Sequence, residues 1–450
     1  MSVSLVILAA GQGTRMNSDL PKVLHTLAGS PLLHHAMAAG RALSPDRTVI
    51  VAGHGAEAVT RAAYAFDDEV NVALQDSQLG TAHAVAQAAP LLGDVAGDAI
   101  VLYGDTPFIR PETLEAMQAA RARHAVVVLG FQAADPGRYG RLIASGEDLH
   151  RIVEFKDATD EERRITLCNS GVVCAETRVL LDLVAAVGCD NAAGEYYLTD
   201  IVEIARNRGL SAGVVICDEA ETLGVNTRAQ LADAERLFQS RARADALENG
   251  VTLTAPETVF FALDTHVGRD AIIGPNVVFG PGVTVESGAE IRAFCHLEGC
   301  HISRGATVGP FARLRPGAEL AEDVHVGNFV EIKNAILDEG VKVGHLTYIG
   351  DADIGENTNI GAGTVTCNYD GVMKHRTRIG KDVFIGSDTM LVAPVTVGDG
   401  ALTASGSVIT EDVPAGAVAL ARARQVIKPG LALRIFDRLR AIKAQKTKGN

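Results

Sequence analysis

Residues 267–297 read VGRDAIIGPNVVFGPGVTVESGAEIRAFCHL, and apolar side chains recur at every sixth position of this stretch. Several of these apolar residues are followed by glycine, which suits a turn after a short strand. A period of six residues is typical of a parallel β-helix, in which stacked coils bury a continuous column of side chains. The in-register positions of this stretch are Val267, Ile273, Phe279, Val285, Ile291 and Leu297.

The same period continues toward the C-terminus, and three hexapeptides are expected to form each coil. The period is interrupted between about residues 366 and 379, where the sequence reads CNYDGVMKHRTR. An irregularity in an otherwise regular solenoid is a common place for function, because loops on a rigid scaffold carry binding residues. The later in-register positions are Ile302, Val308, Leu314, Leu320, Val326, Ile332, Val343, Ile349, Ile379, Ile385, Leu391 and Val397.

The N-terminal half has a different pattern, in which short apolar runs alternate with helix-like stretches. This alternation is typical of an α/β layer with a largely parallel sheet. Ser30-Pro31 is expected to be a helix N-cap followed by proline at the first helical position, opening the helix LLHHAMAAGRAL. The expected strands are SLVILAA, RTVIVAG, DAIVLYGD, AVVVLGF and SAGVVIC, at residues 4–10, 47–53, 98–105, 125–131 and 211–217.

These patterns divide the 450 residues into three parts. Residues 1–228 are expected to form the α/β domain. Residues 229–249 lack proline and interior glycine and are expected to form a connecting helix. Residues 250–450 are expected to form the β-helix domain with a C-terminal tail. The basic, partly amphipathic residues 434–450 fit either a solvated terminal helix or a phosphate-binding segment.

Composition restricts the classes of function. The formal net charge of −14 argues against a broad nucleic-acid footprint, so no nucleic-acid partner is expected. The first apolar stretch is too short for a signal or membrane-spanning segment, so no membrane partner is expected. Seven cysteines form an odd set without a CxxC pair. This favours reduced, mostly buried thiols in a cytoplasmic protein.

A glycine-containing loop follows the first expected strand, and residues 8–25 read LAAGQGTRMNSDLPKVLH. It begins like the dinucleotide fingerprint G-x-G-x-x-G, but Met16 replaces the third glycine, and the loop contains no Walker G-K-[ST] sequence. Gly11 and Gly13 let backbone amides approach an anion, and Arg15 and Lys22 add two cations. The loop is therefore expected to bind a phosphate, although by itself it identifies no reaction.

The opening loop is similar to the signature of sugar-nucleotide pyrophosphorylases. With the hexapeptide half, nearly the whole chain resembles the bifunctional N-acetylglucosamine-1-phosphate uridylyltransferase/glucosamine-1-phosphate N-acetyltransferases of bacterial envelope synthesis. The resemblance implies a Rossmann-like nucleotidyltransferase domain with a mainly parallel sheet, then a connecting helix. A left-handed parallel β-helix of hexapeptide repeats is implied to follow.

For the N-terminal half, the resemblance implies attack of a sugar phosphate on the α-phosphorus of UTP, giving UDP-N-acetylglucosamine and pyrophosphate. Such a displacement needs positioning and charge neutralisation, which Arg15 and Lys22 are expected to supply as catalytic cations. Asp105 and Asn226 are implied to bind Mg²⁺. The residues implied to bind UTP or UDP-N-acetylglucosamine are Leu8, Ala9, Ala10, Gly11, Lys22, Gln75, Gly80, Thr81, Tyr103, Gly104, Asp105, Gly140, Glu154, Asn169 and Asn226.

For the C-terminal half, the resemblance implies acetyl transfer from acetyl-CoA to glucosamine-1-phosphate. An ammonium group has no lone pair with which to attack a thioester, so a general base is needed. His345 is implied to be that base, and Glu331 could orient it. Arg315, Lys333, Tyr348 and Asn359 are implied to bind glucosamine-1-phosphate. The residues implied to bind acetyl-CoA are Ala362, Asn368, Tyr369, Ser387, Ser405 and Arg422.

Spacing gives separate support for part of the sugar-phosphate site. Arg315 and Lys333 are separated by one coil of three hexapeptides, and each directly follows an in-register apolar residue. The two cations should therefore stack in neighbouring coils. They repel one another unless an anion lies between them, and the sugar phosphate is a candidate. An exposed, solvated pair of side chains is the alternative.

The resemblance also implies a homotrimer that assembles through the β-helix, with acetyl-transfer sites between subunits. The chief alternative is a single-activity sugar-1-phosphate nucleotidyltransferase whose β-helix serves assembly or regulation. His345, the stacked cations and the NYDG interruption argue against it, because a structural β-helix needs none of them. A non-catalytic trimeric scaffold is a third hypothesis, against which the intact opening loop and Asp105 argue.

Overall fold

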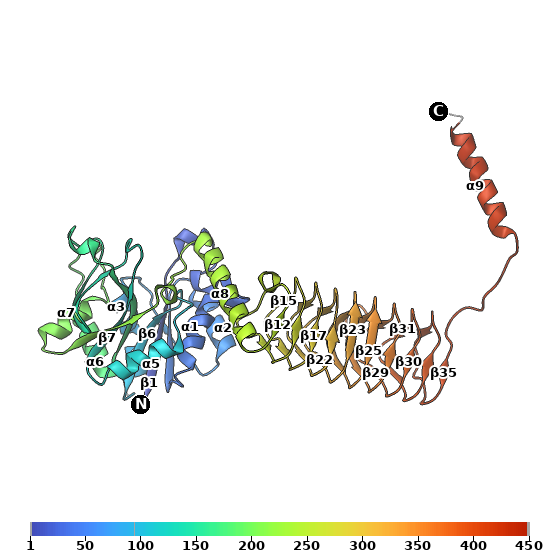
Figure 1. Ribbon diagram of the computed structural model, residues 1–450, viewed down its shortest axis with the longest axis horizontal. Helices are drawn as coiled ribbons and strands as arrows, with labels where there is room; N and C mark the ends of the chain where they lie inside the picture. The colour runs from blue at the N-terminus through green and yellow to red at the C-terminus, as the bar shows by residue number, and fades with distance from the viewer. Residues whose placement is uncertain (1, 94, 448–450) are drawn as a thin grey trace. The chain divides into compact units, whose positions relative to one another are not determined.

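The apolar runs of the N-terminal half become strands of one nine-stranded sheet in the computed structural model, which describes residues 2–93 and 95–447 (Figure 1). All the strands except β9 and β10 run in the same direction, which confirms the prediction of a mainly parallel sheet. Across the sheet the order is β5 (Asn71–Leu74), β4 (Arg47–Ala52), β1 (Val3–Ala9), β6 (Asp98–Tyr103), β10 (Leu167–Glu176), β7 (Val126–Gln132), β11 (Ala212–Cys217), β9 (Asp148–Val153) and β8 (Arg141–Ser145).

Helices cover both faces of this sheet, so successive residues of β1 enter different cores. Leu5 and Ile7 are buried against α1 (Leu32–Arg41), α2 (Ala56–Phe66) and α5 (Pro111–Ala120). Val6 and Leu8 are buried on the other face, against α3 (Thr81–Gln87), α6 (Thr177–Val184) and α7 (Asp200–Asn207). A strand buried on both faces reads as a continuous apolar run, which explains why SLVILAA shows no alternation.

The prediction for Ser30-Pro31 is wrong. Both residues form the short strand β3, which pairs with β2 (Thr26–Leu27), and α1 begins only after Pro31. Ala28 and Gly29 both have positive φ, at 48° and 74°. Two consecutive positive φ angles make the tight hairpin turn that matches strand twist. Because of this turn, Ser30 lies in a strand and not at the N-cap position of α1.

A long helix, α8 (Arg228–Glu248), follows the last strand of the sheet. The side chain of Thr227 caps it by accepting a hydrogen bond of 3.2 Å from the backbone N of Gln230. The helix is joined to the segment that contains Phe261, because Gln239 donates from Nε2 to the carbonyl oxygen of Phe261 at 2.7 Å. Two compact units result, one comprising Met1–Asn249, Ala255–His266 and Val278–Val283, the other Gly250–Thr254, Val267–Val277 and Thr284–Asn450.

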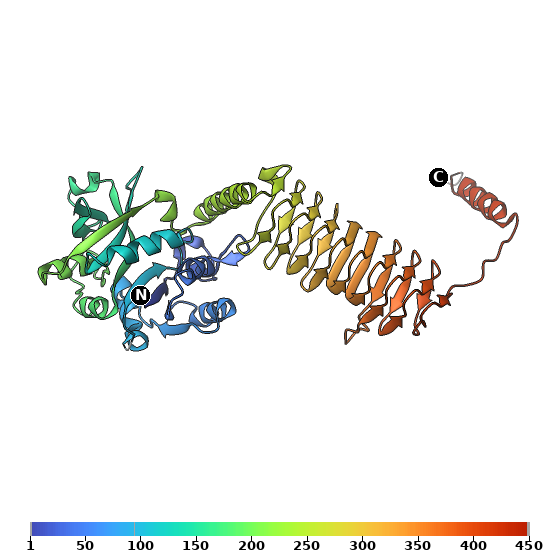
Figure 2. The same ribbon diagram turned by 60° about the horizontal axis from the view of Figure 1, so that its bottom comes forward.

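We refer to these as the N-terminal unit and the β-helix unit. In the latter, strands of two or more residues stack as coils (Figures 1 and 2). One sheet contains β12 (Thr252–Leu253), β14 (Ile272–Ile273), β17 (Glu290–Ile291), β20 (Thr307–Val308), β23 (His325–Asn328), β25 (Lys342–His345), β27 (Asn359–Ile360), β30 (Phe384–Ile385), β33 (Leu402–Thr403) and β35 (Val418–Ala419). The main path of the other contains β13 (His266–Val267), β16 (Thr284–Val285), β19 (Cys300–Ile302), β22 (Ala318–Leu320), β24 (Glu331–Leu337), β26 (Tyr348–Ile354), β28 (Val365–Cys367), β31 (Met390–Val392) and β34 (Val408–Ile409). Off that path lie β15 (Val278–Phe279), β18 (His296–Leu297), β21 (Arg313–Leu314), β29 (Thr377–Ile379) and β32 (Val395–Val397).

The hexapeptide register is confirmed, because every in-register apolar residue from Ile273 to Val397 is buried. Residues that pair between adjacent coils form a column along the β-helix. With one exception, successive members of this column are separated in sequence by three hexapeptides or by one residue fewer. The exception is the step from Ile360 to Ile385, which is longer and contains the predicted interruption. The column consists of Ile273, Ile291, Val308, Val326, Val343, Ile360, Ile385 and Thr403.

The helix α9 (Leu431–Thr447) follows the last coil and includes most of the basic tail. The final residues of that tail, 448–450, lie outside the described residues.

Cysteine reactivity gives a first testable prediction. All seven cysteines are free, four are buried and Cys189 is exposed. Burial raises the pKa of Cys300 to about 12 and that of Cys295 to about 11. Because the thiolate is the reactive form, these thiols should resist a disulfide reagent at mildly alkaline pH. We expect native protein to titrate first at Cys189, Cys189→Ser to lack that fast phase, and unfolded protein to show every thiol. Fast reaction of Cys295 or Cys300 would contradict this.

Across residues 2–93 and 95–447, no helix combines the length and the apolar character needed to span a bilayer.

Candidate functional site

The N-terminal unit has a cavity of about 380 Å³ at the carboxyl ends of β1 and β6. Ligands of α/β sheets bind at this end of the strands. The cavity brings together ten residues that the sequence predicts to bind nucleotide: Leu8, Ala9, Ala10, Gly11, Lys22, Gln75, Gly80, Thr81, Tyr103 and Asp105. Val23, Gln78, Ala84 and Glu195 complete its lining.

Lys22 joins the predicted metal ligands. Its Nζ contacts Oδ2 of Asp105 and donates to Oδ1 of Asn226 at 2.9 Å. Arg15 donates from Nη2 to the same Asn226 oxygen at 2.9 Å. Two cations and two hard oxygen donors therefore meet beside the cavity, although Lys22 and Asn226 lie at opposite ends of the domain sequence.

Gly13 and Met16 explain why the loop departs from the dinucleotide fingerprint. Gly13 has a φ of 65°, and a Cβ at this position would lie 2.5 Å from Cβ of Lys22. Glycine is required here because it allows both the left-handed backbone and the close approach of Lys22. Met16 is only 1% exposed, in the short 3₁₀ turn Thr14–Met16. A third glycine would leave that core position unfilled.

Gln75, Gly80 and Thr81, which are predicted to bind the nucleotide, belong to a segment that packs against residues 195–200. Nε2 of Gln75 donates to the carbonyl oxygen of Gly80 at 3.2 Å. A Cβ on Gly80 would lie 2.5 Å from the carbonyl oxygen of Tyr196, so only glycine fits. Oγ1 of Thr81 accepts a hydrogen bond from the backbone N of Leu198 at 2.9 Å. The EYYLTD sequence, for which sequence reasoning found no role, thus packs against the Gly80-Thr81 turn.

Gly140, Glu154 and Asn169, which the resemblance implies to contact the sugar of UDP-N-acetylglucosamine, form a second group. The backbone N of Asn169 donates to the carbonyl oxygen of Gly140 at 2.9 Å, and a Cβ on Gly140 would lie 3.4 Å from Oε1 of Glu154. Burial raises the pKa of the Glu154 carboxyl, and Oε1 accepts a hydrogen bond from Thr199 at 3.2 Å. Burial and then the charges of Asp105 and Glu154 raise the pKa of Tyr103, so its hydroxyl lies near both groups.

Gly104 does not line the cavity. Its backbone N donates to the carbonyl oxygen of Leu8 at 3.0 Å, which continues the pairing of β1 with β6 past the end of β6. Gly104 thus lies between the lining residues Tyr103 and Asp105, and its contact with the nucleotide stays a prediction.

In the β-helix unit, His345 belongs to a column of predicted acetyl-CoA residues. Asn328 pairs directly with His345 between β23 and β25. Ala362, Ser387 and Ser405 occupy the equivalent position in the next coils, each just after the paired residues of β27, β30 or β33. Arg422 contacts the last residue of this column, because its Nη1 donates to the carbonyl oxygen of Ser405 at 2.9 Å.

Asn328 orients His345, a role that sequence reasoning considered for Glu331. Nδ1 of His345 lies 2.8 Å from Oδ1 of Asn328. Since an amide oxygen only accepts, Nδ1 carries the hydrogen in this contact, and in the neutral ring the lone pair is then on Nε2. Glu331 instead accepts from Arg315 at 2.9 Å and lies 3.8 Å from Arg313. Asn328 precedes His345 by one coil, so the coil period could have identified it.

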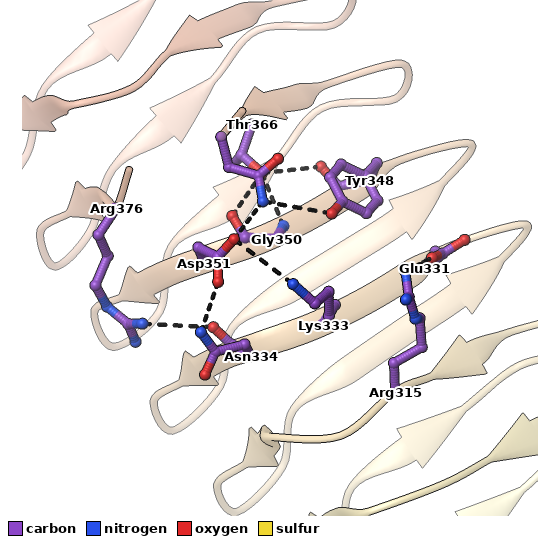
Figure 3. A network of polar contacts seen from close by, with 10 residues as sticks. Arg315, Glu331, Lys333, Asn334, Tyr348, Gly350, Asp351, Thr366 and Arg376 are labelled. Atoms are coloured by element: carbon purple, nitrogen blue, oxygen red, sulfur yellow. Dashed lines mark hydrogen bonds and ion pairs between the residues drawn. The ribbon is translucent and has the colours of Figure 1, made fainter. Parts of the chain in front are cut away.

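Arg315 and Lys333 lie in neighbouring coils, as their spacing predicts, because Leu314 pairs with Ile332. Each has a carboxylate partner in the adjacent coil: Glu331 for Arg315, and Asp351 at 3.8 Å for Lys333 (Figure 3). Lys374 is another cation of this region, and its presence near Lys333 is the main cause that lowers the pKa of Lys333. Sequence reasoning missed Lys374, since it lies in the irregular segment outside the six-residue period.

The remaining predicted residues are divided between both sheets of the β-helix unit and the irregular segment. Tyr348 begins β26, and its hydroxyl lies 3.5 Å from Nδ2 of Asn368. Tyr369 follows and is 60% exposed. Asn359 begins β27 and pairs with Lys342 of the preceding coil. These residues come from β26, β27 and the irregular segment after β28.

Comparison with known proteins assigns the two parts of the chain. Residues 5–215 match the model of the MobA-like NTP transferase domain. Residues 264–299 and 376–411 match the bacterial transferase hexapeptide (six repeats), in agreement with the left-handed parallel β-helix that the sequence led us to expect.

Curated relatives extend over the whole chain and carry the name Bifunctional protein GlmU. The relative from Cereibacter sphaeroides (strain ATCC 17023) is 78% identical over 447 residues, which cover 99% of this chain and 98% of the relative. The relative from Ruegeria sp. (strain TM1040) is 66% identical and is covered completely, as is this chain. That from Jannaschia sp. (strain CCS1) is 64% identical over 446 residues, which cover 99% of this chain and 98% of the relative. The chain therefore belongs to the family of bifunctional GlmU proteins.

Proposed function

We propose that the chain carries out two consecutive transfers. The β-helix domain, residues 250–450, acetylates glucosamine-1-phosphate with acetyl-CoA. The nucleotidyltransferase domain, residues 1–228, then transfers UMP from UTP to N-acetylglucosamine-1-phosphate, giving UDP-N-acetylglucosamine and pyrophosphate for cell-envelope synthesis. Residues 229–249 connect the two. Family membership supports both reactions, and the cavity that gathers ten predicted nucleotide contacts is the observation that carries the proposal furthest.

In the uridylyl transfer, a phosphate oxygen of the sugar phosphate attacks the α-phosphorus of UTP and pyrophosphate leaves. The cations Lys22 and Arg15 are suited to hold the triphosphate and to neutralise charge on the oxygens around the reacting phosphorus. Gln75, Gly80 and Thr81 are suited to read the base. Gly140, Glu154 and Asn169 would hold the sugar, where the Glu154 carboxyl group can accept hydrogen bonds from sugar hydroxyls.

Mg²⁺ fits the group formed by Asp105 and Asn226. One carboxylate and one amide oxygen are hard donors, and they already meet around a single cation, the Lys22 ammonium. No cluster of three or more His, Cys, Asp or Glu side chains placed to hold a metal occurs within the described ranges. Phosphate and water would therefore complete the coordination. When bound, the ion would neutralise phosphate charge.

In the acetyl transfer, the sugar amine attacks the thioester carbonyl, a C–N bond forms and the C–S bond breaks. Nε2 of His345 would take the amine proton, and the hydrogen bond from Nδ1 to Asn328 selects the neutral tautomer whose lone pair is on Nε2. Arg315, Lys333 and Lys374 would hold the phosphate, with Tyr348 and Asn359 on the sugar. Acetyl-CoA would lie along Ala362, Asn368, Tyr369, Ser387, Ser405 and Arg422.

A homotrimer in the cytoplasm is part of the proposal, and an exposed aromatic ladder supports it. Phe294, Phe311 and Phe329 stack along one corner of the β-helix, with ring centroids 4.8 and 5.2 Å apart. Leu346 continues the ladder and is 63% exposed. All four have positive φ, which is unusual for bulky side chains. An exposed apolar stripe marks an interaction surface. Phe311→Glu should reduce the mass measured by light scattering from trimer to monomer.

The function is tested by supplying glucosamine-1-phosphate, acetyl-CoA, UTP and Mg²⁺, and by following free thiol and pyrophosphate separately. Both products are expected. A chelator should stop pyrophosphate release and leave thiol release, because only the uridylyl site has the proposed metal donors. Pyrophosphate from N-acetylglucosamine-1-phosphate without any thiol release would instead support the single-activity alternative.

A further inference from the structure

Asp351 is a nearly buried carboxylate for which neither proposed reaction requires a role. It lies in β26 and is 6% exposed. Its φ is 50°, a left-handed conformation that Asp tolerates better than most residues. A buried carboxylate is costly unless hydrogen bonds and opposite charges compensate it. Its partners therefore indicate what the residue is for.

The two oxygens of Asp351 bind groups from two other parts of the β-helix unit, strand β24 and the irregular segment after β28. Oδ1 accepts a hydrogen bond of 2.5 Å from Nδ2 of Asn334, in the preceding coil. Oδ2 accepts from Nδ2 of Asn368, at the start of the irregular segment, and lies 3.8 Å from Nζ of Lys333. Figure 3 shows Lys333 and Asn334 converging on this one carboxylate. Lys333 is a proposed phosphate ligand and Asn368 a proposed acetyl-CoA ligand, so Asp351 contacts both halves of the site.

The backbone around Asp351 fits this arrangement. A Cβ on Gly350 would overlap the Tyr348 hydroxyl and would lie 2.9 Å from Nδ2 of Asn368. Glycine at 350 thus leaves space for both side chains. The backbone N of Gly350 donates to Oγ1 of Thr366 at 2.7 Å, and that hydroxyl donates back to the carbonyl oxygen of Gly350 at 3.0 Å. These bonds fix the turn that presents Asp351.

Charge explains why a carboxylate is needed here. Lys333 lies 3.8 Å from Asp351, and the positive charge of Lys374 acts on both groups, so two ammonium groups that repel share one carboxylate. Burial opposes ionisation of Asp351, but hydrogen bonds from Asn334 and Asn368 and the charges of Lys333 and Lys374 hold its pKa below the usual value. The carboxylate therefore stays ionised and offsets the repulsion between the lysines.

We propose that Asp351 is a positioning residue that ties the phosphate-binding Lys333 to the acetyl-CoA-binding Asn368, so that the two substrates are held in one fixed relation. The inference rests on the proposed acetyl transfer. It differs from a purely structural role because loss of the carboxylate should affect the binding of both substrates at once. Neither substrate need contact Asp351 itself.

The test uses the full chain with Asp351→Asn, which keeps the size of the side chain and removes its charge. We expect kcat/KM for acetyl transfer to fall by about 10- to 100-fold, the usual cost of losing a residue that orients a ligand. KM should rise for both glucosamine-1-phosphate and acetyl-CoA, while uridylyl transfer stays unchanged. The matched control is Glu356→Gln, which removes an exposed carboxylate paired with Lys381 at 2.9 Å. It should behave like the wild-type protein.

A second measurement covers the case in which Asp351→Asn folds poorly. Lys333→Met should raise KM for acetyl-CoA as well as for the sugar phosphate, and Asn368→Ala should raise KM for the sugar phosphate as well as for acetyl-CoA. Such cross-effects require a shared partner. Their absence, or unchanged KM values in a folded Asp351→Asn protein, would overturn the positioning role. Wild-type protein that releases no thiol would instead refute the proposed acetyl transfer.

Discussion

Replacing His345 by alanine is expected to lower acetyl transfer by about 10²- to 10⁴-fold, the usual contribution of a general base. The imidazole is the group whose Nδ1 is held by Asn328, which leaves Nε2 as the atom able to take the amine proton. Without it, the substrate remains an ammonium ion for most of the time and cannot attack the thioester. The measurement is thiol release from acetyl-CoA with glucosamine-1-phosphate as acceptor.

Uridylyl transfer should survive the same change, because the residues proposed for it all belong to the N-terminal unit. His296→Ala is the matched control, since His296 is also an exposed histidine on a β-helix strand, in β18. We expect the control to retain both activities. A parallel loss of thiol and pyrophosphate release in His345→Ala would show that the protein is misfolded and would contradict the assigned role.

The second large effect is expected for Lys22→Met, which should lower uridylyl transfer by about 10²- to 10³-fold, as removal of one charge-stabilising donor does in other active sites. Among the described residues, Lys22 is the only one whose side chain hydrogen-bonds to both Asp105 and Asn226. Its loss removes a phosphate-binding cation and leaves the proposed metal ligands without the group that holds them together. Pyrophosphate release measures the effect.

Thiol release should be unchanged in Lys22→Met. Arg61→Met serves as the charge-matched control, because Arg61 lies on the exposed face of α2 and pairs only with Glu57 among the ion pairs of the described residues. If Arg61→Met lowered pyrophosphate release as strongly as Lys22→Met, general electrostatics would explain the loss and the specific role of Lys22 would fail.

The fold could be predicted where the sequence is periodic. The hexapeptide period identified the β-helix, and the five apolar runs of the N-terminal half all became strands. The central strand β10 was missed because Asn169, Ser170 and Gly171 interrupt its apolar pattern, and its register shifts between Asn169 and Val173. The hairpin at Ala28-Gly29 was also missed, because this dipeptide lacks the Asn-Gly or Asp-Gly sequence that usually marks such a turn.

The candidate site could be predicted where residues match family motifs or repeat with the coil. Arg315 and Lys333 illustrate the second case, since their spacing alone indicated that they stack. Lys374 and Asp351 could not be found in this way. Lys374 reaches Lys333 from the longest interruption of the repeat, and the role of Asp351 depends on side-chain hydrogen bonds across coils rather than on spacing.

The regular spacing of coils fixes distances along the column that is formed by Asn328, His345, Ala362, Ser387 and Ser405. Neighbouring strands of a sheet are about 4.8 Å apart, so each coil adds this distance along the axis of the β-helix. The stability of a solenoid comes mainly from contacts between adjacent repeats, so a whole coil added between His345 and Ala362 would leave the packing rules satisfied. The same insertion would move His345, the proposed base, away from the proposed acetyl-CoA contacts by the height of one coil. The proposed acetyl transfer therefore fixes the number of coils between those residues, whereas it places no such requirement on the number before Asn328.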